Sequence, residues 1–327
     1  DHRVVTNIKK MLRLRTTAFA SEYKKICFFL SCIAEEMKDK RILFFIEHTR
    51  LGFLAPMIKR IFPDRSIIIF NAHNVEFDYM RQDSQHPLKW VSAYHAEKLA
   101  HHFADVIYVP SLQDLRRHKL LYKNGKANVK LLTFALPRYS GVKNELFLKN
   151  KKELTAIFPG QLSIKHNAEA AIMILDIIAP RIQQIGRNIK FILIGGSPHS
   201  KILKHAHCDN TIIVSNPNDN IIDSSFLESD ILIAPIRRGS GVNIKIMDAM
   251  CYGLAVIGTK IALRGFEPYD SFALIAEDFS KFVEMLIYLD DNREILYRYR
   301  TASIQEFQKR YTLIHRLRKM LIDLSEL

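Results

Sequence analysis

The sequence lacks the cysteine patterns that mark disulfide-rich or zinc-binding proteins. Its four cysteines are scattered, with no CxxC pair and no histidine at zinc-finger spacing. Neither a structural zinc site nor a disulfide framework is indicated, so a reducing cytoplasm is the expected compartment. No apolar run reaches the roughly 18 to 20 residues that span a bilayer. No signal-like apolar segment lies near Asp1, where the sequence begins without a methionine. We expect a soluble cytoplasmic protein, as a fragment or a processed form.

Acidic residues are scarce relative to basic ones. Lys and Arg number 48 against 34 for Asp and Glu, which gives a formal net charge of +14. This excess favours an anionic partner: a phosphorylated small molecule, a lipid headgroup surface or nucleic acid. The sequence has no recognised nucleic-acid module and no basic-and-aromatic stacking motif, so no nucleic-acid partner is expected. It has no DxD motif and no His/Asp cluster, so no metal is expected.

What the sequence does contain is an alternation of short apolar runs with amphipathic stretches. This alternation is typical of a parallel sheet covered by helices. In the first half we predict helices at residues 51–62 and 87–103, and strands at 42–46, 66–70, 105–109 and 129–132. In the second half the strand candidates are 154–160, 190–196, 211–215, 230–236, 254–259 and 272–277. The fold class is therefore α/β, with two doubly wound parallel sheets.

A polar, basic segment, Pro137–Lys152, separates the two halves as an interdomain linker. We predict an N-terminal domain over residues 1–140, a C-terminal domain over 151–305 and a final helical segment over 306–327. Near the start, residues 7–15 (NIKKMLRLR) are basic and amphipathic, as in a helix that lies on a membrane surface. An ordinary helix with one solvated basic face gives the same pattern and is the favoured interpretation.

A glycine-rich loop follows the strand at 230–236 and precedes a helical pattern. The loop holds Arg237, Arg238, Gly239, Ser240 and Gly241, with Lys245 just beyond it. Glycine lets a ligand approach the main chain, and the N–H groups at a helix start bind anions. The loop thus suits a diphosphate, although a tight structural turn needs the same residues with about equal probability.

Two further strands end in glycine. Gly160 and then Lys165 follow the first strand of the second half, where ligands of such folds bind. Lys165 suits phosphate neutralisation, although a solvated surface position is the commoner fate of any lysine. The second strand ends in Gly195 and Gly196 without a full GxGxxG, so a nicotinamide site is not supported.

In the first half, polar side chains come directly after the strand at 66–70. They are Asn71, His73, Asn74 and Glu76. A histidine exchanges protons or donates a hydrogen bond near neutral pH. A lone histidine is more often structural, but four polar residues after a buried strand favour a functional role.

Taken in this order, the motifs resemble retaining glycosyltransferases of family 4 (glycosyl transferase group 1), which have the GT-B fold. The resemblance covers about residues 43–311 and is strongest in DILIAPIRRGSGVNIKIMDAMCYGLAVIGT, residues 230–259. It implies two Rossmann-like domains that face a cleft, with the final helix packing back on the N-terminal domain. It also implies transfer of a sugar from a UDP-, GDP- or ADP-sugar to a hydroxyl, with retention and without a metal.

The resemblance also assigns roles to residues. His73, with Asn74 and Glu76 beside it, lies by the donor sugar and the reacting centre. Gly160 and Lys165 lie by the donor diphosphate, Gly195 and Gly196 lie in the donor nucleotide-sugar site, and Ser215 and Asn216 lie by the base. Arg237, Gly239, Ser240, Gly241 and Lys245 contact the sugar and phosphates. Asp248 replaces the usual glutamate that binds the ribose hydroxyls.

Two substitutions and a shortened start set this sequence apart from the family pattern. Ser240 and Asp248 stand where glutamates are usual, and the opening strand with its Gly-rich loop has no counterpart. A non-catalytic nucleotide- or sugar-binding protein of the same fold is therefore the rival interpretation, and a basic nucleic-acid-binding protein is the weaker alternative. For an active enzyme, the acceptor is a glycan or a lipid-linked glycan of the cell surface, and the basic charge suits peripheral attachment to an anionic membrane.

Overall fold

The computed structural model describes residues 23–83, 86–136, 153–204, 209–239 and 241–326. The chain divides into two compact units, residues 1–132 (unit 1) and 133–327 (unit 2). The predicted linker Pro137–Lys152 and the basic segment 7–15 lie outside the described residues. Each unit contains one parallel sheet, so the predicted α/β class is confirmed.

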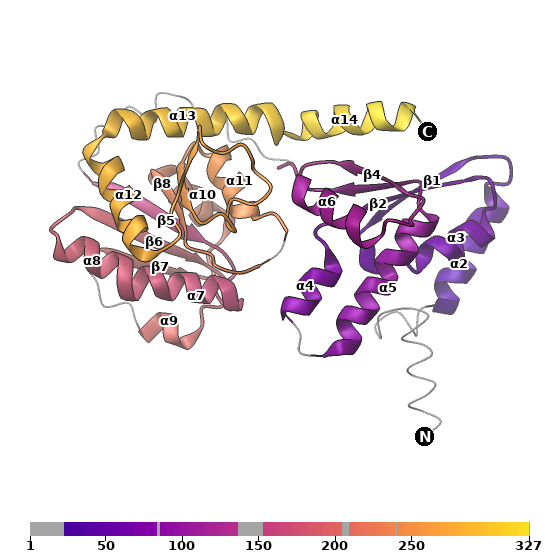
Figure 1. Cartoon of the computed structure of the whole chain (residues 1–327), viewed down its shortest axis with the longest axis horizontal. Coiled ribbons are helices and arrows are strands. Elements are labelled where there is room, and N and C mark those ends of the chain that lie inside the picture. Colours follow the sequence, from indigo (N-terminus) through magenta and orange to yellow (C-terminus); the bar gives the residue numbers. More distant parts are fainter. Residues whose placement is uncertain (1–22, 84–85, 137–152, 205–208, 240, 327) are drawn as a thin grey trace, which may run out of the picture. The chain divides into compact units, whose positions relative to one another are not determined.

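Unit 1 is a four-stranded sheet of order β1-β2-β3-β4. Its strands are β1 (Ile42–Glu47), β2 (Ser66–Asn71), β3 (Val106–Val109) and β4 (Asn128–Leu131). Its helices are α2 (Tyr23–Glu36), the 3₁₀ turn η2 (Thr49–Leu51), α3 (Leu54–Ile61), α4 (Glu76–Asp83), α5 (Pro87–Phe103) and α6 (Leu112–Leu121). Because the strand order follows the chain, right-handed crossovers place α3, α5 and α6 on one face of the sheet (Figure 1).

Unit 2 is a doubly wound sheet of order β10-β9-β8-β5-β6-β7. The strands are β5 (Leu154–Pro159), β6 (Ile189–Gly195), β7 (Thr211–Ser215), β8 (Ile231–Ala234), β9 (Ala255–Gly258) and β10 (Ala273–Ile275). The order reverses at β5, which has β6 on one side and β8 on the other. This is the switch point at which α/β folds open a crevice for ligands.

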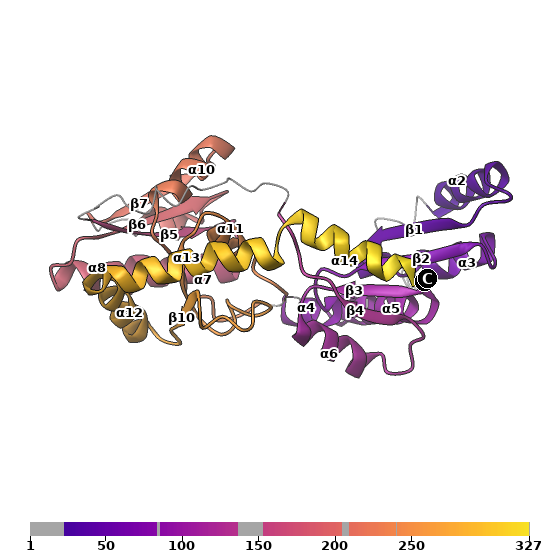
Figure 2. The same ribbon diagram turned by 90° about the horizontal axis from the view of Figure 1, so that it is seen from above.

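Helices cover both faces of the unit 2 sheet. They are α7 (Lys165–Met173), the π-helical turn η4 (Ile174–Ile178), α8 (Ala179–Gln184), α9 (Ser200–Lys204), α10 (Asp219–Glu228), α11 (Ile244–Cys251), α12 (Phe279–Asp291), α13 (Arg293–Arg310) and α14 (Leu313–Ser325). α7, α8 and α9 lie on one side of the sheet and α13 on the other (Figure 1). From above, α10 lies toward the β7 edge and α12 toward the β10 edge (Figure 2).

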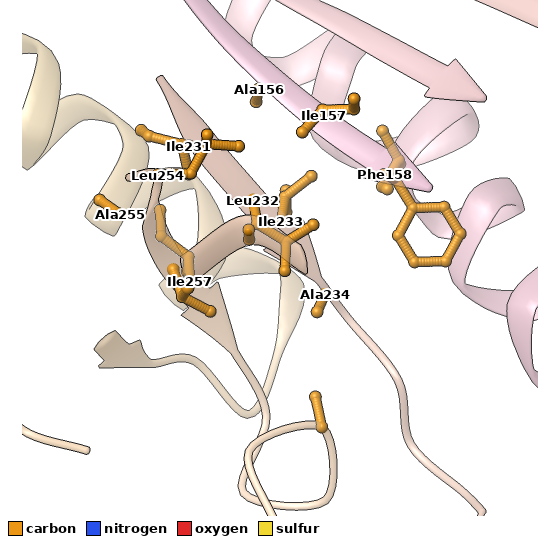
Figure 3. Packing of buried hydrophobic residues seen from close by; sticks show 14 of the residues in the cluster. Ala156, Ile157, Phe158, Ile231, Leu232, Ile233, Ala234, Leu254, Ala255 and Ile257 are labelled. Carbon is orange, nitrogen blue, oxygen red and sulfur yellow. The ribbon is translucent and has the colours of Figure 1, made fainter. Parts of the chain in front are cut away.

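The core of unit 2 lies between its central strands and these helices. Every residue of β5, β8 and β9 is buried, as expected for strands covered on both faces (Figure 3). Asp230, just before β8, accepts a hydrogen bond from the Thr155 amide at 3.0 Å and pairs with Arg300 of α13 at 2.6 Å. This buried pair attaches α13 to the amino end of the sheet.

The end of α13 and all of α14 lie within the predicted final helical segment, residues 306–327. Leu136 forms a β-bridge with Thr312, between α13 and α14, within unit 2. Packing of the final helix on the N-terminal half stays a prediction. Among the described residues, no helix is both long and apolar enough to cross a membrane.

Candidate functional site

A cavity of about 820 Å³ lies at the carboxyl ends of β5 and β6 in unit 2. Such a volume is typical of small-molecule sites. The cavity lies at the switch point described above. The predicted binding residues in its wall are Gly160, Gly195, Gly196, Asn216, Lys245 and Asp248. We call this cavity the donor pocket.

Glycines form the floor of the donor pocket because two turns meet there. A Cβ atom on Gly195 would lie 1.6 Å from the carbonyl oxygen of Gly160, so the turns after β5 and β6 are in direct contact. Gly160 has a φ of +153°, and a Cβ there would lie 3.1 Å from Lys245 Nζ. Its bare main chain therefore gives a ligand room beside the lysine.

Lys245 is the cation of the donor pocket. It is the second residue of α11, and its Nζ donates a hydrogen bond to Asn167 Oδ1 at 2.6 Å and lies 4.5 Å from the centre of the Phe158 ring. Burial lowers the pKa of Lys245 to about 7, and the charge of nearby Asp248 only partly opposes this. A bound anion would supply the missing compensation.

Asp248 lies one helical turn beyond Lys245. Burial raises the pKa of Asp248 to about 6, while the charge of Lys245 lowers it. The start of α11 also faces the pocket through Asn243 and Ile244. No side chain caps this helix start. The Ile246 N–H donates to the Asn243 carbonyl oxygen at 3.0 Å, so the N–H groups of Ile244 and Lys245 are the ones that suit an anion.

One part of the donor-pocket wall is apolar. Pro217, Ile222, Phe226 and Val242 contribute to it, and Phe226 stacks on Tyr252 with ring centres 4.8 Å apart. Asn216, in the left-handed region with φ of 49°, accepts a hydrogen bond from the Ser197 amide at 2.7 Å. A flat base fits such a wall, with the main chain around Asn216 at its edge.

Several predicted residues do not line the donor pocket. Lys165 begins α7 and is exposed, and Ser215 is exposed at the end of β7. Arg237 is exposed, while Arg238 pairs with Glu169 at 3.1 Å.

The glycine-rich loop is only partly described. Gly239 accepts a bond from Arg264 at 3.4 Å, and Gly241 has a φ of +76°, which favours glycine. Neither glycine is among the pocket-lining residues. Ser240 lies outside the described residues.

Sequence reasoning missed Gln161, His166 and Asn167, which do line the pocket. Asn167 is buried, and its Nδ2 donates to the Gln161 carbonyl oxygen at 3.0 Å. This hydrogen bond orients the Asn167 amide so that its Oδ1 accepts a hydrogen bond from Lys245 Nζ. A signal was present: an asparagine stands at the start of an otherwise apolar helical face.

In unit 1, polar side chains gather where β1 and β2 end. Glu47 and Asn71 are paired in register on these parallel strands. Glu47 Oε2 accepts a hydrogen bond from Asn71 Nδ2 at 2.7 Å and lies 2.9 Å from His73 Nε2. The sequence analysis identified His73 but missed Glu47, although Glu47 follows directly on a predicted strand.

Glu76 lies deeper in the same region and is fully buried. Its carboxylate pairs with the Arg50 guanidinium, and its Oε2 is 3.4 Å from His48 Nε2. Burial raises the pKa of Glu76, while Arg50 opposes this shift. Burial also lowers the pKa of His48 to about 4, so this imidazole is neutral at pH 7.

These side chains form one group, which we call the polar cluster: Glu47, His48, Arg50, Asn71, His73 and Glu76. The His48 and His73 rings lie 5.2 Å apart between centres. Asn74 lies beside the cluster; its carbonyl oxygen accepts from His118 Nε2 at 3.3 Å. Within the described residues, no group of three or more His, Cys, Asp and Glu side chains is arranged to hold a metal ion.

Residues 153–292 match the family model described as Glycosyl transferases group 1. A curated relative, an uncharacterized 44.6 kDa protein in the cps region of Klebsiella pneumoniae, is 28% identical over 115 residues. The matched stretch is 33% of this chain and 30% of that protein, so the chain spans about a third of the relative's length. The stretch that matches this family model lies within unit 2.

Solved structures resemble 91–95% of the chain. A UDP-forming trehalose-phosphate synthase from Burkholderia xenovorans matches with a TM-score of 0.70 at 12% identity, over 95% of this chain and 79% of that one. Sucrose-phosphate synthase from Thermosynechococcus elongatus matches with a TM-score of 0.69 at 12% identity, over 91% and 77%. Anabaena HepE in complex with UDP and glucose matches with a TM-score of 0.64 at 12% identity, over 91% of this chain and 81% of that one. These likenesses confirm the predicted GT-B fold.

Proposed function

We propose that the protein is a retaining glycosyltransferase that moves a sugar from a nucleoside diphosphate to an acceptor hydroxyl. The observation that carries this proposal is Lys245, a recessed cation held by Asn167 beside the bare main chain of Gly160. This arrangement suits a diphosphate, and it lies within the stretch that matches the group 1 glycosyltransferase model.

In the proposed reaction, the bond between the anomeric carbon and the β-phosphate oxygen breaks, and its electron pair stays on that oxygen. The acceptor oxygen bonds to the same face of the anomeric carbon, and its proton passes to the departing phosphate. Lys245 and the N–H groups at the start of α11 stabilise the growing negative charge. We propose that this positive charge serves without a divalent cation, so chelation by EDTA should leave the rate unchanged.

For the donor, we propose a UDP-sugar. The solved structures of Anabaena HepE contain UDP, UDP with glucose or UDP-glucose, which supports UDP as the nucleotide to test first. In this chain, Asp248 would bind the ribose hydroxyls, and the apolar wall around Phe226 would hold the base. The Arg237 to Gly241 loop would contribute to sugar and phosphate binding.

For the acceptor, we propose a glycan or lipid-linked glycan of a cell-surface polysaccharide. The cps-region description of the Klebsiella relative supports this assignment, and the net charge of +14 suits an anionic membrane surface that carries such lipids. We further propose that His73 acts in the transfer step, with its ring oriented by Glu47 at 2.9 Å.

The alternative function is binding of a nucleotide sugar without turnover, and the observation that favours it is the shorter Asp248 carboxylate. A thermal-shift screen of the purified chain against UDP-, GDP- and ADP-sugars selects the donor. Release of the nucleoside diphosphate from that donor, in the presence of glycan acceptors, then tests turnover. A raised midpoint with no nucleotide release would favour the alternative, and no shift with any donor would refute both.

A further inference from the structure

Glu97, on α5, is a buried carboxylate of unit 1 that accepts hydrogen bonds from four donors. Its side chain is fully buried, and four donors converge on its two oxygens. Oε1 accepts from Thr49 Oγ1 at 3.1 Å and from the Glu76 amide at 2.9 Å. Oε2 accepts from the Phe77 amide at 3.1 Å and from the Tyr122 hydroxyl at 2.7 Å.

The donors come from three separate segments of the chain. Thr49 belongs to the turn after β1, Glu76 and Phe77 begin α4 after β2, and Tyr122 follows α6. The turn after β1 and the turn between β2 and α4 are the two that carry the polar cluster. Glu97 therefore accepts hydrogen bonds from both turns, although it is distant from both in sequence.

The chemistry of the four bonds favours an ionised carboxylate. Two of the donors are main-chain N–H groups, which can only donate, and an ionised carboxylate can only accept. Burial raises the pKa of Glu97 above its ordinary value, and the bonds from Tyr122, Glu76, Phe77 and Thr49 oppose this shift only in part. The negative charge also stands at the N-terminus of α4, where a helix favours an anion.

A second contact holds the first turn against the same helix. Gly52 packs so closely on α5 that a Cβ atom there would lie 1.8 Å from the Ala96 carbonyl oxygen. Ala96 directly precedes Glu97. The turn that carries His48 and Arg50 is therefore seated on α5 at two adjacent residues.

We propose that Glu97 is a positioning residue: it fixes the turn after β1 against the start of α4, and so sets the geometry of the polar cluster. The pairing of Arg50 with the buried Glu76 links the two turns, and the Glu76 amide donates to Glu97. Loss of Glu97 frees Glu76 from below, and the Arg50 and His48 contacts to its carboxylate shift with it. This inference rests on the proposed function only where activity is the readout.

The first test is Glu97→Gln in the full chain. The amide has the same shape, but its NH₂ group must face one pair of donors, so one side of the arrangement opens. We expect the His48 and His73 imidazole NMR signals to move and the Glu76 and Phe77 amides to exchange faster with solvent. With a UDP-sugar donor we expect kcat to fall on the order of 10- to 100-fold, since small misplacements of reacting groups have such costs. UDP affinity and the donor KM should stay unchanged.

A matched control is Asp105→Asn. Asp105 is a carboxylate of the same unit that accepts from the Ile68 amide at 2.7 Å and from Lys59, at the amino end of β3. We expect this variant to leave the imidazole signals and kcat unchanged. Thr49→Val is the milder probe should Glu97→Gln fail to fold: it removes one donor and should move the His48 signal more than that of His73.

Unchanged imidazole signals in Glu97→Gln, or in Thr49→Val if the first variant does not fold, would overturn the inference. A kcat loss equal to that of Asp105→Asn would do the same, because Glu97 would then act through stability alone. Failure of the proposed function is separately visible: the unsubstituted chain would release no UDP, while the NMR and exchange readouts would still decide the role of Glu97.

Discussion

The polar cluster of unit 1 and the donor pocket of unit 2 both lie at the carboxyl ends of parallel strands, but their charges are arranged differently. In the polar cluster, Glu47 contacts His73 and Glu76 pairs with Arg50, so the charged groups are matched within the protein. In the donor pocket, Lys245 is held by the neutral Asn167 and is short of compensation.

The charges that compensate each region therefore come from different sources: the protein itself in the polar cluster and a bound ligand in the donor pocket. A cation that burial makes costly gains most from an anion supplied by the ligand, so the donor pocket is built to bind. Side chains that already orient one another are built to be held in place, as expected of groups that act during a reaction. If this is correct, substitutions in the donor pocket should impair UDP binding, and substitutions in the polar cluster should impair sugar transfer.

The largest expected effect comes from Gly195→Ala. The new methyl group would meet the Gly160 carbonyl oxygen at 1.6 Å, so the turns after β5 and β6 must separate. We expect UDP binding to be lost in isothermal titration calorimetry, with a stability loss of about 1–3 kcal/mol from overpacking. The control is Gly186→Ala, where no atom lies within 4 Å of the new methyl group and only a φ of +71° adds strain. Retained UDP binding in Gly195→Ala would refute the claim that close contact between these two glycine turns is needed to bind UDP.

The next effect is in the other unit. We expect His73→Ala to lower the rate of sugar transfer on the order of 10²-fold, as removal of one polar group at a reacting centre does. UDP affinity should stay within about twofold, because the donor pocket is complete within unit 2. UDP-release kinetics and calorimetry on the same preparation check both. A loss of UDP affinity as large as the loss of rate would show that His73 acts in donor binding and not in transfer alone.

A smaller effect is the pH dependence of binding. Burial lowers the pKa of Lys245 to about 7 from the ordinary 10.5, and a bound diphosphate should raise it again. UDP binding then takes up a proton above pH 7, so its Kd should rise by up to about tenfold per pH unit from pH 7 to 9. In Lys245→Met the Kd should be flat over that range, and a flat profile in the unsubstituted chain would argue against Lys245.

The same shift affects the empty protein. The folded pKa of Lys245 is depressed, so its contribution to stability is present above pH 10.5 and is lost as the pH falls through about 7. Asp248 has a raised folded pKa of about 6, so its contribution is present below pH 3.8 and is lost as the pH rises through 6. Chemical denaturation of the Lys245→Met and Asp248→Asn variants across pH separates the two groups.

The smallest expected effect is that of Asp248→Asn on UDP affinity, about tenfold, as expected for a hydrogen bond to a charged group. Asp248→Glu should retain or improve affinity by restoring the longer reach. Comparison of UDP with free pyrophosphate checks the assignment, because only UDP carries the ribose. An equal loss for both ligands would place Asp248 at the phosphates instead.

Much of the fold followed from the sequence because parallel strands buried on both faces form continuous apolar runs. The runs at 154–160 and 230–236 contain β5 and β8, and the alternation with helical patterns indicated the layers. The glycines of the donor pocket were identified for the same local reason: each ends a strand. Asp248 was identified through the resemblance to a known family.

The missed residues depend on contacts across the chain. Lys165 and Asn167 are two residues apart at the start of α7, yet Lys165 is exposed and Asn167 is buried beside Lys245. Which of them faces the pocket depends on where α7 begins, and helix boundaries are weakly encoded. Glu97 reads as an ordinary charge on the helical pattern at 87–103, because its four donors lie 20 to 48 residues away.

The most direct test of the account compares Lys245→Met with Lys165→Met. Calorimetric titration of each variant with UDP at pH 7 measures the affinity of the donor pocket. We predict a loss on the order of 100-fold or more for Lys245→Met, because a charge-assisted contact to the diphosphate disappears. Lys165→Met should keep nearly the full affinity. Equal affinities in the two variants, or the larger loss in Lys165→Met, would contradict the account.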